Sequence, residues 1–211
     1  MKKYGLILMC LLMTHTISSV ATDNSTVKIA SKLHTEGVIL AELMTHLVNH
    51  AGGKAIHLRE LGGTHVIWKA LKRSEVDLYV EYTGTIMKEL FPNSRLKTIE
   101  DIRQRLLQDK VLISKPLGFN STYAISMKTE VAAQYGITKI SDLRHYPDLR
   151  FGFTERFLAR KDGWQSLRQT YQLPQTNVRG LHHYLAYQGL NSGAIDLMDA
   201  YSTDGEVAYY N

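Results

Sequence analysis

The chain has one cysteine in 211 residues, and that residue, Cys10, lies in the apolar run near the N-terminus. Two lysines precede this run and small residues up to Ala21 follow it, which is the pattern of a secretory signal peptide. Cys10 follows Met9 inside the run, whereas a lipoprotein signal places a small residue before a cysteine at the end of the run. We therefore expect residues 1–21 to be cleaved near Ala21, leaving an exported, periplasmic chain. A mature chain without cysteine excludes disulfides, thiolate metal sites and cysteine nucleophiles.

Long apolar segments and a strong charge of one sign are also missing. The apolar run near the N-terminus is shorter than the roughly 20 residues that span a bilayer, and no later stretch approaches that length. The chain has 25 lysines and arginines against 20 aspartates and glutamates. Removal of the two lysines in the signal peptide lowers the net charge from +5 to +3. So small a charge does not indicate a nucleic-acid partner.

From Val27 onward, short apolar runs alternate with longer helical patterns, which is typical of an α/β fold with a largely parallel sheet. Pro116 and Gly118 interrupt this alternation and indicate a crossover into a second lobe. We expect strands at 27–30, 55–58, 76–80, 123–127, 149–153, 177–180 and 195–198, and helices at 36–49, 64–72, 98–108, 130–135, 163–171 and 182–190.

Tyrosine is abundant, with 12 residues, and several tyrosines lie where an expected strand passes into a loop. In α/β sheets such strand ends face the ligand crevice. A single tyrosine is more simply explained as filling the half-buried rim of a sheet, with its ring packed and its hydroxyl in water. The tyrosines at these strand ends are Tyr79, Tyr82, Tyr123 and Tyr201.

Six segments carry a stronger signal through their order and spacing. They are VKIASKLHTEGVILAEL (27–43), ELGGTHVIWKAL (60–71), VDLYVEYTGT (76–85), LGFNSTYAISM (117–127), RFGFTERFLARKDGW (150–164) and GAIDLMDAYSTDGE (193–206). Together they resemble the osmoprotectant-binding proteins, the ProX-like periplasmic components of glycine betaine, carnitine and choline importers. The EYTGT and AYSTDGE motifs are the most specific, and the resemblance covers the chain from about Val27 to its end.

This resemblance implies a two-lobed, type II periplasmic-binding-protein fold that holds a small quaternary amine between its lobes. It also implies delivery to the permease and ATPase of an ABC importer, with no cofactor and no enzymatic activity. By motif, Tyr82, Tyr123 and Tyr201 would form the aromatic cage of the family. A trimethylammonium group has no N–H to donate, but ring faces attract a cation by up to ~2 kcal/mol per desolvated contact. Micromolar binding requires about 8 kcal/mol, so several rings must act together.

The resemblance further implies that the carboxylate of a betaine would be bound by Lys32, Thr85 and Arg160. Arginine would bind it through two parallel hydrogen bonds and lysine as a point charge, which favours a zwitterion such as glycine betaine over choline. Most lysines and arginines are simply solvated, so only the motif context supports this assignment. The chain departs from the family at His34 and Gly37, where an aromatic residue or asparagine and a glutamine are common. We expect this departure to weaken the contact at Lys32. His34 could be a polar contact in the cleft, but a solvated loop histidine is the simpler expectation.

A metal site and an enzyme are the alternatives from other classes. The histidines at 46 and 50 and the pair at 182 and 183 have no clear acidic partner in the sequence, and HExxH is absent, so we predict no metal site. The sequence also lacks GxSxG, GxGxxG and P-loop motifs. Glu36, Glu81, Glu155 and Asp204 could supply acid–base pairs, but such residues more often cap helices or form turns, and Asp204 is most simply a turn residue. A third hypothesis is a domain without a transport role, which either senses an osmolyte or is a vestigial binding domain.

In the resembling family the chain returns from the second lobe and completes the first. We therefore assign residues 22–115 to lobe 1, 116–200 to lobe 2, and 201–211 to the start of the return crossover. A turn is expected at 203–205, with no closing helix after it. We accordingly expect a chain truncated at its C-terminus relative to the family, with an incomplete lobe 1 that exposes apolar surface.

Overall fold

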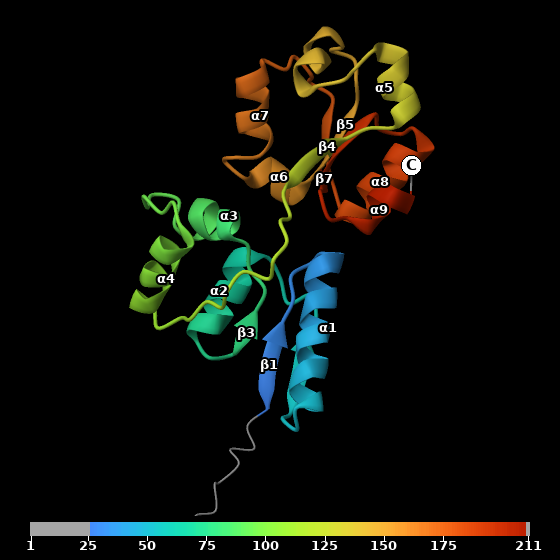
Figure 1. Ribbon diagram of the computed structural model, residues 1–211. Coiled ribbons are helices and arrows are strands. Elements are labelled where there is room, and N and C mark those ends of the chain that lie inside the picture. The colour runs from blue at the N-terminus through green and yellow to red at the C-terminus, as the bar shows by residue number, and fades with distance from the viewer. Residues whose placement is uncertain (1–25, 210–211) are drawn as a thin grey trace, which may run out of the picture.

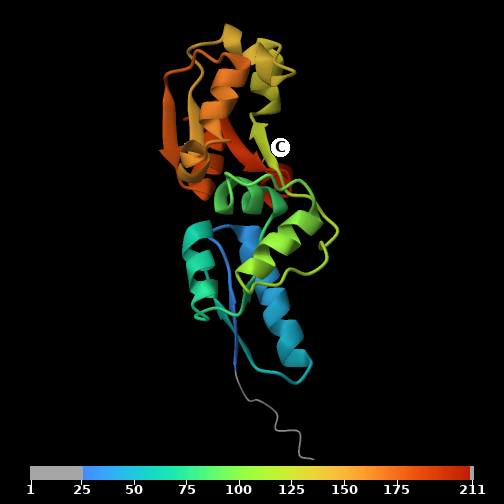
Figure 2. The ribbon, with the colours of Figure 1, turned by 90° about the vertical axis from the view of Figure 1, so that its left-hand side faces the viewer.

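The computed structural model describes residues 26–209, so the predicted signal peptide lies outside the described residues. The chain forms two α/β lobes, which lie one above the other in Figures 1 and 2. Each lobe has its own sheet and its own buried apolar clusters. No helix between residues 26 and 209 combines the length and the apolar character needed to cross a membrane.

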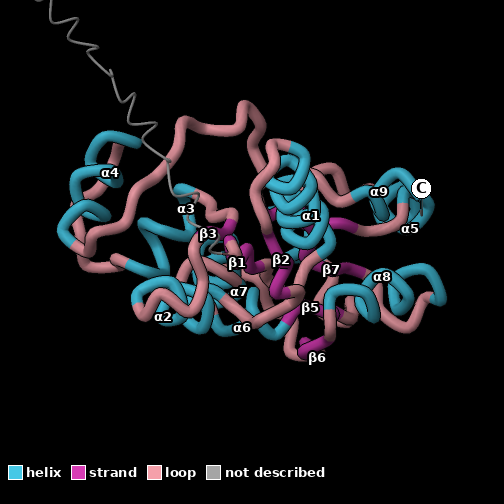
Figure 3. Tube along the Cα trace, turned by 90° about the horizontal axis from the view of Figure 1, so that it is seen from below, coloured by secondary structure: helices cyan, strands magenta, loops and turns pink. Residues whose placement is uncertain are grey.

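Lobe 1 contains a three-stranded parallel sheet with helices on both faces (Figures 1 and 3). A second buried cluster lies under its last helices, formed by Ile86, Ile102 and Leu106. The elements are β1 (Val27–Ala30), α1 (Thr35–His50), β2 (Ala55–Leu58), α2 (Thr64–Lys72), β3 (Leu78–Tyr79), α3 (Thr83–Thr85), the π-helical η1 (Ile86–Leu90) and α4 (Ile99–Gln108). The strand order is β2-β1-β3.

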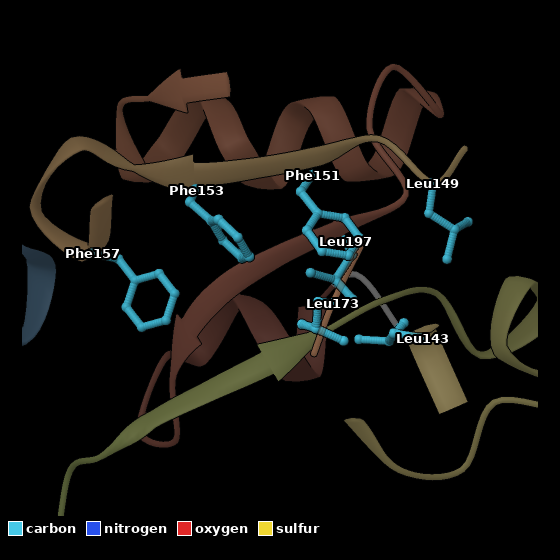
Figure 4. Packing of buried hydrophobic residues seen from close by; sticks show 7 residues of the cluster. All are labelled: Leu143, Leu149, Phe151, Phe153, Phe157, Leu173 and Leu197. Carbon is cyan, nitrogen blue, oxygen red and sulfur yellow. The ribbon is translucent and has the colours of Figure 1, made fainter. Parts of the chain in front are cut away.

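Lobe 2 contains a four-stranded mixed sheet. Its core is rich in phenylalanine, with Phe151 and Phe153 on one strand facing Phe157 and Leu197 (Figure 4). The elements are β4 (Tyr123–Ser126), α5 (Thr129–Tyr135), the 3-10 helix η2 (Ile140–His145), β5 (Phe151–Thr154), α6 (Glu155–Ala159), α7 (Trp164–Tyr171), β6 (Val178–Leu181), α8 (His183–Ser192), β7 (Leu197–Tyr201) and α9 (Gly205–Tyr209). The strand order is β4-β7-β5-β6, with β4 antiparallel to β7 and the other pairs parallel.

The sequence located most elements, and the predictions at 27–30, 55–58 and 64–72 agree residue for residue. The strand predicted at 76–80 is shorter, because Asp77 uses its side chain as well as its backbone at the start of the ladder. Its carboxylate accepts from the backbone N–H of Lys28 at 2.7 Å, while its own N–H donates to the Lys28 carbonyl at 2.9 Å. Of the predicted strand, only Leu78 and Tyr79 (β3) therefore pair with β1 as a regular strand.

The end of lobe 2 differs more from the prediction. The strand predicted at 195–198 is β7, which continues to Tyr201 because that residue still pairs with Tyr123. The expected lobe boundary after residue 200 therefore falls inside β7. The predicted turn is present, with the N–H of Asp204 donating to the carbonyl of Tyr201 at 3.0 Å. It leads into α9, a one-turn helix that the sequence did not predict and that lies with lobe 2 in Figure 1.

The first long helix of lobe 1 has an uncovered apolar stripe. Ile39, Leu43 and Leu47 follow one another at helical spacing and are 55%, 52% and 63% exposed. The same helix buries Val38 and Ala41 against the sheet. Other apolar side chains of lobe 1 are exposed as well, among them Val66 and Leu112.

Candidate functional site

Two of the predicted cage tyrosines are neighbours because β4 and β7 pair in antiparallel register. Tyr123 lies opposite Tyr201, and their ring centroids are 5.1 Å apart at an interplanar angle of 44°. Phe157 of α6 packs against the ring of Tyr123, with 5.0 Å between centroids. Because Phe157 belongs to the buried core of lobe 2, the position of this tyrosine pair is fixed by that core.

The third predicted cage tyrosine comes from lobe 1. Tyr82 is the N-cap residue of α3, and its hydroxyl donates to the carboxylate of Glu36 at the start of α1. Burial, and then the nearby carboxylates, raise the pKa of Tyr82, so the phenol stays neutral. A neutral phenol keeps its proton for the hydrogen bond to Glu36.

His34 joins the tyrosines of the two lobes, and its placement corrects the expectation of a solvated loop residue. Its ring centroid lies 6.0 Å from that of Tyr82 and 5.7 Å from that of Tyr201, both edge-on. The imidazole is held there because its Nδ1 accepts the N–H of Gly37 at 3.0 Å and so caps α1. We call His34, Tyr82, Tyr123 and Tyr201 the aromatic cluster.

Lys32 lies beside the aromatic cluster but already has a partner. Its side chain is 2% exposed, and its ammonium donates to the carboxylate of Glu81. The same carboxylate accepts the N–H of Tyr82 at 2.9 Å. Burial lowers the pKa of Lys32, and Glu81 opposes that effect. The Lys32 ammonium is 5.8 Å from the centroid of the Tyr82 ring, so the ion pair of Lys32 and Glu81 borders the aromatic cluster on the lobe 1 side.

Thr85 and Arg160, the other two predicted site residues, approach from opposite lobes. Thr85 is buried in α3, one helical turn after Tyr82. Arg160 is the C-cap residue of α6, and its guanidinium carbon is 5.5 Å from the centroid of the Tyr123 ring. Asp162 holds the guanidinium through contacts of 2.8 and 2.7 Å. The structure therefore brings five of the six predicted residues together at the lobe boundary and buries the sixth, Thr85, in α3. Their roles in binding stay a prediction.

Two charged residues that the sequence did not single out connect the lobes. Arg156 of α6 donates to the hydroxyl of Thr64 at the start of α2 and to the carboxylate of Glu89 on η1, the latter at 3.2 Å. Glu89 also accepts from Arg160. The spacing of Arg156 and Arg160 was a usable signal, because residues four apart share one helix face. Glu89 had no such signal, since its partners are 67 and 71 residues away.

Asp204 does more than form the predicted turn. Its Oδ2 accepts from the N–H of Tyr201 at 2.8 Å, from Tyr187 at 2.9 Å and from Nε2 of His183 at 2.9 Å. The His183 ring packs on Tyr201 with 5.0 Å between centroids. Asp204 therefore holds the backbone of Tyr201 and His183 packs against its ring, and together they fix the orientation of that ring.

Cavities large enough for a small molecule occur away from the aromatic cluster. One of about 390 Å³ lies against β4 and α5, and another of about 470 Å³ lies beside α1. Neither is lined by a predicted site residue. Within residues 26–209, no three histidine, aspartate or glutamate side chains gather closely enough to hold a metal ion. The aromatic cluster is packed across the lobe boundary.

Comparison with known proteins shows which family the chain belongs to. The OpuAC family model, described as the substrate-binding domain of ABC-type glycine betaine transport systems, matches residues 25–211. The ergothioneine transport permease/ergothioneine binding protein EgtU of Helicobacter pylori (strain G27) is 29% identical over 195 residues, which are 89% of this chain and 35% of that protein. The carnitine transport binding protein OpuCC of Listeria monocytogenes is 25% identical over 202 residues, which are 90% of this chain and 65% of that protein. The chain thus spans about a third of the first relative and just under two thirds of the second.

Solved structures agree on the fold. A structure described as a glycine betaine/carnitine/choline ABC transporter is 26% identical, with a TM-score of 0.61 over 87% of this chain and 71% of that chain. Apo YehZ from Escherichia coli is 24% identical, with a TM-score of 0.59 over 88% of this chain and 73% of that chain. These matches confirm the predicted α/β, type II periplasmic-binding-protein fold. Because the OpuAC model matches residues 25–211, which include the whole of the described chain, the protein belongs to this family of substrate-binding domains.

Proposed function

We propose that the chain captures a zwitterionic quaternary amine, glycine betaine or a close relative, between its two lobes. The observation that carries this proposal is the aromatic cluster, in which His34 connects Tyr82 of lobe 1 with Tyr201 of lobe 2. Ring faces suit a trimethylammonium group, because it is a cation without a hydrogen-bond donor. Three tyrosine faces at up to ~2 kcal/mol each supply most of the about 8 kcal/mol that micromolar binding requires.

The carboxylate of the ligand has basic partners next to the same rings. Arg160 offers a planar fork of N–H donors beside Tyr123, which suits a carboxylate. Both cations already have carboxylate partners, Glu81 for Lys32 and Glu89 with Asp162 for Arg160. We assign Arg160 the main part because a guanidinium can bind a carboxylate through two parallel hydrogen bonds, and Lys32 a supporting one. The hydroxyl of Thr85 is a further donor on the lobe 1 side. This arrangement favours a zwitterion over choline, which has no carboxylate.

The relatives support the same choice. Their names refer to ergothioneine, carnitine and glycine betaine. These three compounds share a trimethylammonium group and a carboxylate, although the rest of each molecule differs. We therefore propose that the chain recognises this shared pair of groups and that its other contacts select among such compounds.

Binding between lobes also supports a role in delivery rather than chemistry. A ligand that contacts both lobes stabilises the closed arrangement, and no bond is made or broken. We propose that the closed chain presents its ligand in the periplasm to the permease of an ABC importer, which its ATPase drives. Uptake of labelled glycine betaine by cells with and without the chain tests this step, and binding without any effect on uptake would indicate a sensing role.

Isothermal titration of the purified chain with glycine betaine, carnitine, ergothioneine and choline tests the binding proposal. We expect at least one zwitterion to bind more tightly than choline, and Tyr201→Ala to weaken that binding about 30-fold or abolish it. Tyr184→Ala is the matched control, because Tyr184 is an exposed tyrosine of α8 outside the aromatic cluster. If a folded wild-type chain binds none of the four compounds, or if both variants behave alike, the proposed function is wrong.

A further inference from the structure

The lobes are joined at the aromatic cluster by three charged side chains, Glu89, Arg156 and Arg160, which we call the inter-lobe ion cluster. Glu89 lies on η1 of lobe 1, the segment that Figure 2 shows next to lobe 2. Both arginines belong to lobe 2 and reach the same carboxylate oxygen, Oε1 of Glu89. The Glu89 side chain is 16% exposed and that of Arg160 is 8% exposed. The ion cluster is therefore largely shielded from the water and salt that weaken surface ion pairs.

The two arginines need an anion between them. Arg156 and Arg160 are four residues apart on one helical turn, where like charges repel each other. Asp162 balances part of the charge of Arg160, and Glu89 is the carboxylate that both guanidinium groups share. Burial alone would raise the pKa of Glu89, but the two arginines outweigh burial and lower it. Glu89 is therefore a carboxylate anion at neutral pH.

This carboxylate lies where a bound zwitterion would place its own. The Arg160 guanidinium carbon is 5.5 Å from the Tyr123 ring centroid, and Tyr123 is 5.1 Å from Tyr201. In glycine betaine a single methylene group separates the ammonium from the carboxylate. A trimethylammonium group on these rings therefore brings the carboxylate to the donors that Glu89 uses. Two carboxylates cannot both take the same N–H groups without repelling each other.

We propose that Glu89 is an internal competitor for the carboxylate of the ligand and thereby sets the specificity of the site. This inference rests on the proposed function, because it concerns how a zwitterion enters the same cluster. A zwitterion must displace Glu89 from Arg156 and Arg160. Choline leaves the ion cluster intact and gains from the negative charge of Glu89 nearby. Glu89 therefore narrows the difference in affinity between the two kinds of ligand.

The test is isothermal titration of the full chain and its Glu89→Gln variant with glycine betaine and with choline. We expect Glu89→Gln to tighten glycine betaine binding about fivefold or more, the usual lower range for coupled sites, and to leave choline binding unchanged or weaker. Glu100→Gln is the matched control, since it removes an exposed carboxylate of the same lobe from α4. That control is expected to change neither affinity.

Opposite results separate the explanations. If Glu89→Gln weakens glycine betaine, or changes both ligands by the same factor, Glu89 is only a structural partner and the inference is overturned. If the wild type and every variant fold but bind neither ligand, the proposed function itself has failed. Glu89→Asp covers the case in which Glu89→Gln does not fold, because it keeps the charge and shortens its reach. We expect that variant to bind glycine betaine more tightly than the wild type, and unchanged or weaker binding would overturn the inference as well.

Discussion

The imidazole of His34 fills the space that a side chain at Gly37 would need. A Cβ atom at position 37 would lie 2.4 Å from Cε1 and 2.6 Å from Nδ1 of His34. The N–H of Gly37 donates to that same Nδ1 at 3.0 Å, so the ring caps α1 while it contacts Tyr82 and Tyr201. The two departures from the family pattern are thus a single feature, because the histidine can adopt this position only beside a glycine.

A double-mutant cycle tests this dependence. Gly37→Gln should displace the His34 ring and remove the cap of α1, which lowers the free energy of unfolding by about 1 kcal/mol. In a His34→Asn background the same change should have a smaller effect, because asparagine caps a helix with a shorter side chain. Urea denaturation of the four proteins measures the coupling. An equal loss in both backgrounds would show that the two positions are independent.

The position of His34 also predicts pH-dependent binding. Burial lowers the pKa of His34 below its usual 6.5, and the charges of Lys32 and Arg156 act in the same direction, while Glu36 opposes them. The ring is therefore neutral at pH 7.5 and gains its proton only in more acidic solution. A proton on His34 adds a cation to the aromatic cluster and repels a quaternary ammonium group. We expect glycine betaine affinity to fall between pH 7.5 and pH 5.

The matched variant for that prediction is His34→Asn, which removes the titrating ring and keeps a helix cap. Its glycine betaine affinity should change much less over the same pH range than that of the wild type. Titration calorimetry at both pH values gives the change in glycine betaine affinity with pH for each protein. If the affinity of both proteins changes equally with pH, the pH dependence comes from another group.

The ion pair of His183 and Asp204 predicts how stability changes with pH. Burial would lower the pKa of His183, but Asp204 outweighs it and raises the pKa above 6.5. Burial would raise the pKa of Asp204, but His183 and the N–H of Tyr201 outweigh it and lower the pKa below 3.8. The contribution of His183 to the free energy of unfolding is therefore fully present below pH 6.5 and is lost as the pH rises through the raised pKa. The contribution of Asp204 to the free energy of unfolding is fully present above pH 3.8 and is lost as the pH falls below that value.

His183→Asn should consequently lower the free energy of unfolding more at pH 5.5 than at pH 8.5, by about 1 kcal/mol. Urea denaturation at the two pH values measures the difference. His65→Asn, which changes an exposed histidine of α2, is the control and should show no such dependence. A loss at His183 of equal size at both pH values would mean that only neutral packing against Tyr201 matters.

The sequence predicted those parts of the site that depend on local pattern and strand order. Tyr123 begins one predicted strand and Tyr201 follows another by three residues, and the pairing of β4 with β7 makes them neighbours at the lobe boundary. The motif context also placed Tyr82, whose position at the N-cap of α3 is set by its own segment. Local sequence is sufficient for features of this kind.

Other parts of the site depend on contacts between distant residues or on space left by a missing side chain. Glu89 meets Arg156 only because the two lobes approach each other, and no helical or strand period connects residues 67 positions apart. His34 looked like a solvated loop residue because its place over α1 depends on the absence of a Cβ at Gly37. The end of β7 was misplaced because its last pair, Tyr201 with Tyr123, is decided by a strand 78 residues earlier.

Close backbone packing at Gly163 carries the last prediction. A Cβ atom there would lie 2.0 Å from the carbonyl oxygen of Phe157 and 3.2 Å from Cβ of Arg160. The first of these is a backbone atom of α6 and cannot turn aside as a flexible side chain would. Gly163→Ala must therefore shift α6, which carries Arg160 to its place beside Tyr123 and anchors Phe157 in the core.

We expect Gly163→Ala to lower the free energy of unfolding by about 1–3 kcal/mol, the usual range for overpacking, and to weaken glycine betaine binding as well. Gly205→Ala is the control, because a Cβ at the start of α9 would meet no atom within 4 Å. Urea denaturation and titration calorimetry report the two effects separately. Loss of stability with unchanged binding would show that α6 can move without displacing Arg160, and that the arginine is held by Glu89 and Asp162 rather than by the helix that carries it.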